Sequence, residues 1–154
     1  MKYYLLLLTF IGVLFTSNAQ SFDLQFDHTA LSVSDLDKSA AFYHDILQLH
    51  EIPTPASNPT LRWFDLGNNH QLHLIKSDAK SIEKTPKALH FSVHLADIDA
   101  FVAYLDKNKV DYINWLGDSK ETSLRPDGVR QIYVQDPDGY WIEINDASYL
   151  SDQK

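Results

Sequence analysis

Four side chains of this sequence have types and positions suited to binding a divalent metal ion. The pattern that begins at His28 recurs from His90. In each copy the histidine opens a short alternating run, and an Asp-apolar-Asp sequence follows at Asp35 and at Asp97. Core packing alone does not require a repeated histidine. Two strands with matched histidines, each leading into a helix, can be related by a pseudo-two-fold axis. We therefore predict a duplicated unit that brings the two imidazoles together.

Alternation along the predicted strands shows which face each candidate occupies, because successive side chains point to opposite sides of a sheet. In four strands, small or polar residues share one face with a candidate ligand, and aliphatic or aromatic residues take the other. The polar faces are expected to form a cupped binding surface. Three imidazoles and one carboxylate suit Zn²⁺, Ni²⁺, Fe²⁺, Co²⁺ or Mn²⁺, with four or six coordination positions. The predicted metal ligands are His28, His73, His90 and Glu143.

Other polar residues on or near these faces are weaker candidates for binding. His94 is predicted to lie on the same strand face as His90, where it could contact a metal ligand or a substrate. Arg125 and Arg130 flank a glycine-containing loop and could meet an anionic substrate, although most surface arginines are simply solvated. The side chains that could line the cup are Gln71, Tyr133 and Trp141.

Composition excludes several kinds of function. The chain of 154 residues has no cysteine, so disulfides, thiolate ligands and a cysteine nucleophile are ruled out. Its net charge of −8 argues against nucleic acid or an anionic membrane as a partner. The partner that we expect is a small-molecule substrate.

The first 19 residues have the features of a secretory signal. Lys2 precedes an apolar run that is short for a membrane span, and small residues stand at Ser17 and Ala19. We predict cleavage near Ala19-Gln20 and export to the periplasm or the medium, with no membrane attachment afterwards. A retained membrane anchor is the alternative.

Each half of the remaining chain has the pattern strand, helix, three strands. Helical spacing of apolar residues follows Asp35 and Asp97. A polar link at 77–87 separates module one, about 24–76, from module two, about 87–147, within one domain at 22–148. The sequence 136–139 predicts a tight turn. The predicted strands are 26–33, 49–52, 61–66, 71–76, 88–95, 111–115, 129–134 and 140–145, of which 49–52 and 111–115 are weaker.

Several of these motifs carry a family resemblance that spans residues 24–147. Through them the chain resembles the vicinal oxygen chelate superfamily, which includes glyoxalase I, extradiol dioxygenases, methylmalonyl-CoA epimerase, and the fosfomycin and bleomycin resistance proteins. The motifs are His28 before Asp35-Leu36-Asp37, Leu66-Gly67 followed by Gln71-Leu72-His73-Leu74-Ile75, His90, and Asp136-Pro137-Asp138-Gly139-Tyr140-Trp141-Ile142-Glu143-Ile144.

The resemblance implies an α+β fold in which two paired βαβββ modules form an open cup-shaped barrel around one divalent metal ion. The ligands would come from the first, fourth, fifth and eighth strands, at His28, His73, His90 and Glu143. Members of the superfamily pair their modules within one chain or exchange them across a dimer. A homodimer is therefore one of two arrangements to expect.

One position departs from the glyoxalase I pattern. Members of that group usually have glutamate where this chain has His73, and the resemblance implies that their two glutamates shuttle the substrate proton. Here Glu143 is the single carboxylate that could act as a base. Glutathione-dependent glyoxalase I activity is therefore not expected. Extradiol dioxygenases need three open coordination positions, which a ligand at His73 would crowd.

These observations favour an exported glyoxalase-like metalloprotein. We expect a metal-dependent lyase or isomerase that acts on a small substrate chelated through vicinal oxygens, with Glu143 as the catalytic base. Two alternatives are a non-catalytic small-molecule binding protein of the antibiotic-sequestering type and an extradiol-type ring-cleaving dioxygenase. Tightly bound iron would indicate the dioxygenase, and no tightly bound metal would indicate the binding protein.

Overall fold

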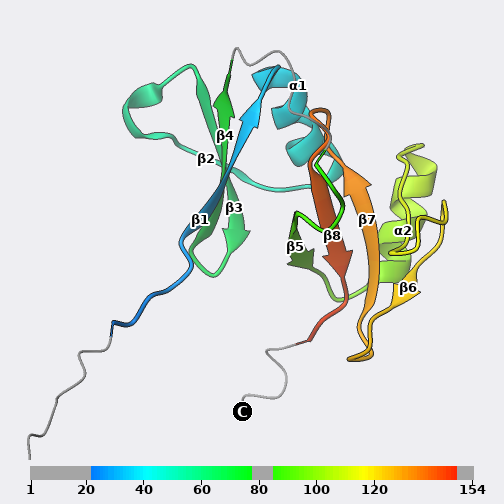
Figure 1. The fold of residues 1–154 in the computed structure, drawn as a ribbon. Coiled ribbons are helices and arrows are strands. Elements are labelled where there is room, and N and C mark those ends of the chain that lie inside the picture. Colours follow the sequence, from blue (N-terminus) through cyan, green and yellow to red (C-terminus); the bar gives the residue numbers. More distant parts are fainter. Residues whose placement is uncertain (1–21, 78–84, 149–154) are drawn as a thin grey trace, which may run out of the picture.

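The structure is a computed structural model that describes residues 22–77 and 85–148. Figure 1 shows two separate sheets and an N-terminal segment that runs away from them. The predicted signal, residues 1–19, lies outside the described residues, so export stays a prediction. None of the helices in the described ranges is long and apolar enough to cross a membrane.

The first module is a four-stranded sheet with the order β1-β4-β3-β2. β1 is parallel to β4, and the other neighbours are antiparallel. A short α-helix continues into a π-helical turn before the second strand. The elements are β1 (His28–Val33), α1 (Leu36–Ala41), η1 (Phe42–Ile46), β2 (Glu51–Ile52), η2 (Pro55–Ser57), β3 (Leu61–Gly67) and β4 (His70–Lys76).

The second module repeats this arrangement with the order β5-β8-β7-β6. β5 is parallel to β8, as β1 is to β4. The predicted α+β architecture of two βαβββ modules is thus confirmed, although the two sheets do not close on each other. The elements are β5 (His90–His94), α2 (Ile98–Lys107), β6 (Ser123–Leu124), β7 (Arg130–Gln135) and β8 (Trp141–Asn145).

Both helices begin where the sequence predicts. The side chain of Asp35 accepts a hydrogen bond from the Lys38 N–H at 3.0 Å, and that of Asp97 accepts one from the Ala100 N–H at 2.9 Å. Each aspartate therefore satisfies an amide in the first turn that has no partner within the helix.

The strand predicted at 111–115 is wrong. Ile113 makes only isolated bridges, to Ser119 and Tyr133. The chain turns immediately afterwards, because the amide oxygen of Asn114 accepts the backbone N–H groups of Gly117 and Asp118. The short strand of this module is β6, which lies outside the predicted strands.

A single core joins the two modules. It contains the apolar faces of both sheets together with side chains from both helices. α1 packs on β3 and β4, and Tyr104 of α2 donates a hydrogen bond to the Asp45 carbonyl of η1. The fully buried members with the largest side chains include Tyr43, Phe64, Leu72, Leu74, Leu105, Ile132, Ile142 and Ile144.

The turn between β7 and β8 ties the second module to the first. Its backbone closes through the Gly139 N–H to the Asp136 carbonyl, and Gly139 has a φ of +91° that favours glycine. Asp138 accepts hydrogen bonds from the backbone and hydroxyl of Ser34 and from the hydroxyl of Ser39, at 2.6–2.9 Å. Tyr43 donates to Asp136 at 2.9 Å. The predicted turn is therefore confirmed, and it is also a contact between the modules.

Replacing Asp138 with alanine should destabilise the protein by about 2 kcal/mol at neutral pH, because three hydrogen bonds to a charged group are lost. Burial opposes ionisation of Asp138, but the hydrogen bonds from Ser34 and Ser39 outweigh it and lower the pKa of its carboxyl below 3.8. The stabilisation is therefore present above the unfolded-state pKa and is lost as the pH falls through the folded-state pKa.

Urea unfolding of both proteins at pH 7 and near pH 3 measures this difference. Asp111, whose side chain is 96% exposed, provides a matched aspartate-to-alanine control with little expected effect. An unchanged difference between wild type and Asp138→Ala at the two pH values would contradict the assignment.

Candidate metal centre

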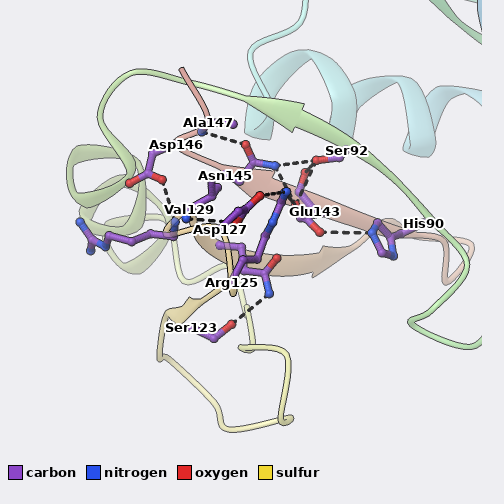
Figure 2. A network of polar contacts seen from close by, with 12 residues as sticks. His90, Ser92, Ser123, Arg125, Asp127, Val129, Glu143, Asn145, Asp146 and Ala147 are labelled. Carbon is purple, nitrogen blue, oxygen red and sulfur yellow. Dashed lines mark hydrogen bonds and ion pairs between the residues drawn. The ribbon is translucent and has the colours of Figure 1, made fainter. Parts of the chain in front are cut away.

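Glu143 of β8 is the centre of a buried polar network on the second sheet (Figure 2). The residue is only 5% exposed. Its Oε1 accepts hydrogen bonds from the Asn145 amide at 2.7 Å, the Arg125 guanidinium at 3.2 Å and the Ser92 hydroxyl at 3.3 Å. Its Oε2 accepts one from the Tyr133 hydroxyl at 2.7 Å. A buried carboxylate is costly unless it is paired and hydrogen-bonded, and this one is both.

These contacts keep Glu143 ionised. Burial raises the pKa of its carboxyl, but hydrogen bonds from Tyr133 and Asn145 and the charges of His90 and Arg125 outweigh burial and lower it below 4.5. For Tyr133, burial and the Glu143 carboxylate raise the pKa well above its ordinary value of 10. Tyr133 is therefore a hydrogen-bond donor to Glu143 throughout the physiological pH range.

His90 of β5 faces the same carboxylate. Its Nδ1 lies 2.7 Å from the Lys87 carbonyl, which can only accept, so Nδ1 carries the proton. Nε2 lies 3.2 Å from Oε2 of Glu143. Two donors on one metal ion, each about 2.1 Å from it, are separated by about 3.0–3.4 Å. The 3.2 Å spacing is that of an ion pair, and it also matches two donors on one divalent metal ion.

His28 and His73 form a second pair on the first sheet. Their rings stack with centroids 4.2 Å apart, and Trp63 of β3 stacks on the other side of His73 at 3.9 Å. His28 uses Nδ1 to contact Asp27, which leaves Nε2 free to bind a metal. His73 donates from Nε2 to the Gln71 side chain at 2.8 Å. Burial and the charge of His28 lower the pKa of His73, which favours the neutral form that a metal ligand needs.

The two pairs do not meet within one chain. Over residues 22–77 and 85–148, no group of three or more histidine, aspartate or glutamate side chains is placed to hold a metal ion. The convergence of all four predicted ligands is therefore not seen in these residues. The assignment of His28, His73, His90 and Glu143 as ligands stays a prediction. The structure places these residues in two pairs, one on each sheet, which we call half-sites.

A hollow of about 730 Å³ lies beside the His90–Glu143 half-site. Tyr133 and Arg125 line it, and both contact Glu143. Lys87 donates to the carbonyls of Asn114 and Trp115. Its ammonium group also lies over the rings of Trp115 and Tyr133. These contacts hold the 114–118 turn next to the Glu143 network. Exposed apolar side chains of this wall are Trp115, Leu116 and Leu124.

The weaker candidates from the sequence make different contacts in the structure. Arg125 joins the Glu143 network, whereas Arg130 pairs with Asp99 of α2. His94 is exposed and lines a separate hollow with Phe26 and His70. Gln71 contacts His73, and Trp141 donates to the Thr85 carbonyl.

Sequence reasoning missed residues that orient the candidate ligands. Asp27 immediately precedes His28, so its role could have been inferred from adjacency. The carbonyl of Lys87 that orients His90 depends on a backbone turn. Trp63 reaches His73 only through the β3–β4 register, in which the two residues are paired. Neither of these last two contacts has a signal in the sequence.

Comparison with known proteins assigns the chain to a family. The family model described as Glyoxalase/Bleomycin resistance protein/Dioxygenase superfamily matches residues 25–144. The chain belongs to this superfamily. Its members typically bind a divalent metal and small molecules, and many form dimers.

Two relatives and one solved structure illustrate the similarity. YwbC of Bacillus subtilis (strain 168) is 27% identical over 123 residues, which cover 77% of this chain and 94% of that protein. Human mitochondrial methylmalonyl-CoA epimerase is 29% identical over 133 residues, 79% of this chain and 73% of the epimerase. The crystal structure of a glyoxalase family protein from Bacillus anthracis matches with a TM-score of 0.66 at 24% identity, covering 82% and 98% of the two chains.

Changing Tyr133 to phenylalanine should raise the pKa of Glu143 in the metal-free protein. The hydroxyl donates to the ionised carboxylate, so its removal destabilises the charged form. A carboxyl-detected NMR titration of Glu143 measures the shift. Tyr112→Phe is the matched control, since that hydroxyl contacts Asp106 and Lys120 rather than Glu143. A fall in the Glu143 pKa in Tyr133→Phe would show that the hydroxyl plays another role.

Proposed function

We propose that the protein is an exported metal-dependent lyase or isomerase that acts on a small substrate chelated through vicinal oxygens. The observation that carries this proposal is the Glu143 network, in which a buried carboxylate is held ionised and aligned with a histidine nitrogen 3.2 Å away. Human methylmalonyl-CoA epimerase, 29% identical, supports an activity that moves a proton on such a substrate.

The residues that would hold the metal are His28, His73, His90 and Glu143. The ion would be Zn²⁺, Ni²⁺, Fe²⁺, Co²⁺ or Mn²⁺, since three imidazoles and a carboxylate do not distinguish among them. When bound, it would supply Lewis-acid stabilisation of negative charge on the substrate oxygens. His73 would first have to release its hydrogen bond to Gln71 or bind through Nδ1.

Glu143 is the group that would accept the substrate proton. Asn145 and Ser92 hold its Oε1, and Tyr133 holds its Oε2, so the carboxylate is oriented before substrate arrives. Preorganised polar groups of this kind lower a barrier because they need not reorient during the reaction. The adjoining hollow, walled by Trp115 and Leu124, would hold the apolar part of the substrate and exclude water.

Two copies of the chain would complete the site, in the module-exchanged arrangement. His28 and His73 of one copy would meet His90 and Glu143 of the other. The basis is the shared core: each ligand pair lies on the sheet face opposite to the apolar face that enters this core, so the two pairs are turned away from it. A two-fold dimer would contain two equivalent sites.

Hydrogen exchange tests the proposed chemistry. The metal-loaded protein would be incubated in D₂O with methylmalonyl-CoA and, separately, with the hemithioacetal of methylglyoxal and glutathione. Deuterium entering the acidic carbon of either compound, and its loss in Glu143→Gln, would support proton transfer by Glu143. Binding without exchange would favour the sequestering protein, and oxygen uptake on catechol with iron would favour the dioxygenase.

Mixing two inactive variants should restore metal binding if the site is shared between copies. His28→Ala and Glu143→Ala should each lose stoichiometric metal. When they are co-expressed, the mixed dimer has one site with all four ligands, so about one quarter of the sites should be restored at random pairing. Calorimetric metal titration measures this fraction.

The matched control is co-expression of His28→Ala with His73→Ala. Both substitutions fall in the same half-site, so every possible site lacks a ligand and nothing should be restored. Metal retention in the single variants would contradict the ligand assignment. No restoration by the first mixture would contradict the exchange of modules.

A further inference from the structure

Arg125 is held between two carboxylates at the edge of the Glu143 network (Figure 2). Its Nη1 lies 3.2 Å from Oε1 of Glu143, and its Nη2 lies 2.5 Å from Oδ2 of Asp127. The Glu143 side chain is 6% exposed, whereas that of Asp127 is 46% exposed. The guanidinium therefore connects a buried carboxylate to one that reaches solvent.

The backbone around Arg125 is a closed turn. Its N–H donates to the Val129 carbonyl at 2.8 Å, and its carbonyl accepts the Gly128 N–H at 3.0 Å. Gly128 has a φ of +86°, which this turn requires and which glycine adopts without strain. Because the main chain is fixed, a change in the partner of Arg125 needs only a movement of its side chain.

Glu143 already has a nitrogen facing each of its oxygens. His90 faces Oε2, and Arg125 faces Oε1. The guanidinium stays charged at any pH the protein meets. A divalent ion bound at Glu143 would be placed next to this charge in a poorly solvated site, where like charges repel strongly. Binding of a metal to Glu143 and the contact between Glu143 and Arg125 therefore weaken each other.

We propose that Arg125 is a built-in counter-ion that competes with the metal for Glu143, and that Asp127 receives the guanidinium when the metal binds. This inference rests on the proposed function, because it takes Glu143 as a metal ligand. It adds a control on metal affinity. In the metal-free protein, Arg125 neutralises the buried carboxylate of Glu143. When the metal binds, the guanidinium leaves Glu143 and keeps its contact with Asp127. Arg125 acts through Glu143 and is a positioning residue.

The competition predicts that substitutions of Arg125 and of Asp127 change the metal affinity in opposite directions. Without the arginine, the metal no longer has to displace a cation, so its affinity rises. Without the charge of Asp127, the guanidinium loses an anion that would hold it away from Glu143, so its contact with Glu143 is strengthened and metal affinity falls. A merely structural role for the turn would lower the affinity in both cases.

The test is calorimetric titration of the full chain with Zn²⁺ alone. Arg125→Gln should bind about tenfold more tightly than wild type, and Asp127→Asn about tenfold more weakly, within the usual range of coupling between two sites. The double variant should resemble Arg125→Gln, because Asp127 acts only through the arginine. Asp127→Asn keeps a side-chain oxygen for the Val129 N–H, so the turn can still form.

Arg130→Ala is the matched control. This arginine begins β7 in the same part of the sheet, but it pairs with Asp99 and does not touch Glu143, so zinc affinity should not change. Near-ultraviolet circular dichroism checks that each variant is folded, and Arg125→Ala is measured in place of Arg125→Gln if that variant is not.

The outcomes separate this inference from the proposed function. If wild type binds zinc and Glu143→Ala does not, but the Arg125 and Asp127 variants shift in the same direction or not at all, the competition is wrong and the metal site stands. If wild type binds no zinc, the assignment of the metal site is wrong, and the proposed competition is wrong as well.

Discussion

The burial of both apolar sheet faces in one core is the constraint on which the rest of the structure depends. β-strands alternate, so any residue opposite a buried position must lie on the other face of its sheet. The candidate ligands all occupy these opposite faces, and the shared core separates them into two half-sites. In the described residues, the same packing that stabilises the chain leaves the four candidate ligands in two separate pairs.

The turn at 136–139 serves both packing and chemistry. Asp136 attaches it to η1, and Asp138 attaches it to α1 and the loop before α1. Tyr140 donates to the Ser32 carbonyl of β1. β8 begins directly after this turn and carries Glu143. The position of the carboxylate relative to the first module therefore depends on contacts that are made at the other end of the strand.

The second half-site is more completely built than the first. Glu143 is buried, and its hydrogen bonds outweigh the cost of burial, so it is ionised without a metal. The first half-site is more exposed and depends on ring stacking among His28, His73 and Trp63. The buried, ionised carboxylate and the adjoining hollow therefore lie in the second module, while the first module contributes two stacked imidazoles.

Local patterns in the sequence determined most of the fold. Asp35 and Asp97 predict the helix starts because a cap involves only adjacent residues, and alternation separates core from polar positions because the strand period is built into the backbone. The 111–115 strand failed because the amide of Asn114 folds the chain back on itself, a side-chain preference that periodicity does not detect. The residue types suited to metal binding were also visible, since matched histidines and a strand glutamate need no structure to be recognised.

Tertiary structure decided what those residues contact. Trp63 meets His73 through strand register, and Arg125 reaches Glu143 from the turn between β6 and β7. Both contacts therefore depend on how separate strands pair. The separation of the ligands into two pairs depends on how the modules pack, which is set by the summed burial of many side chains. A sequence pattern specifies the face on which a side chain lies, whereas only the packing of whole sheets specifies which other face it meets.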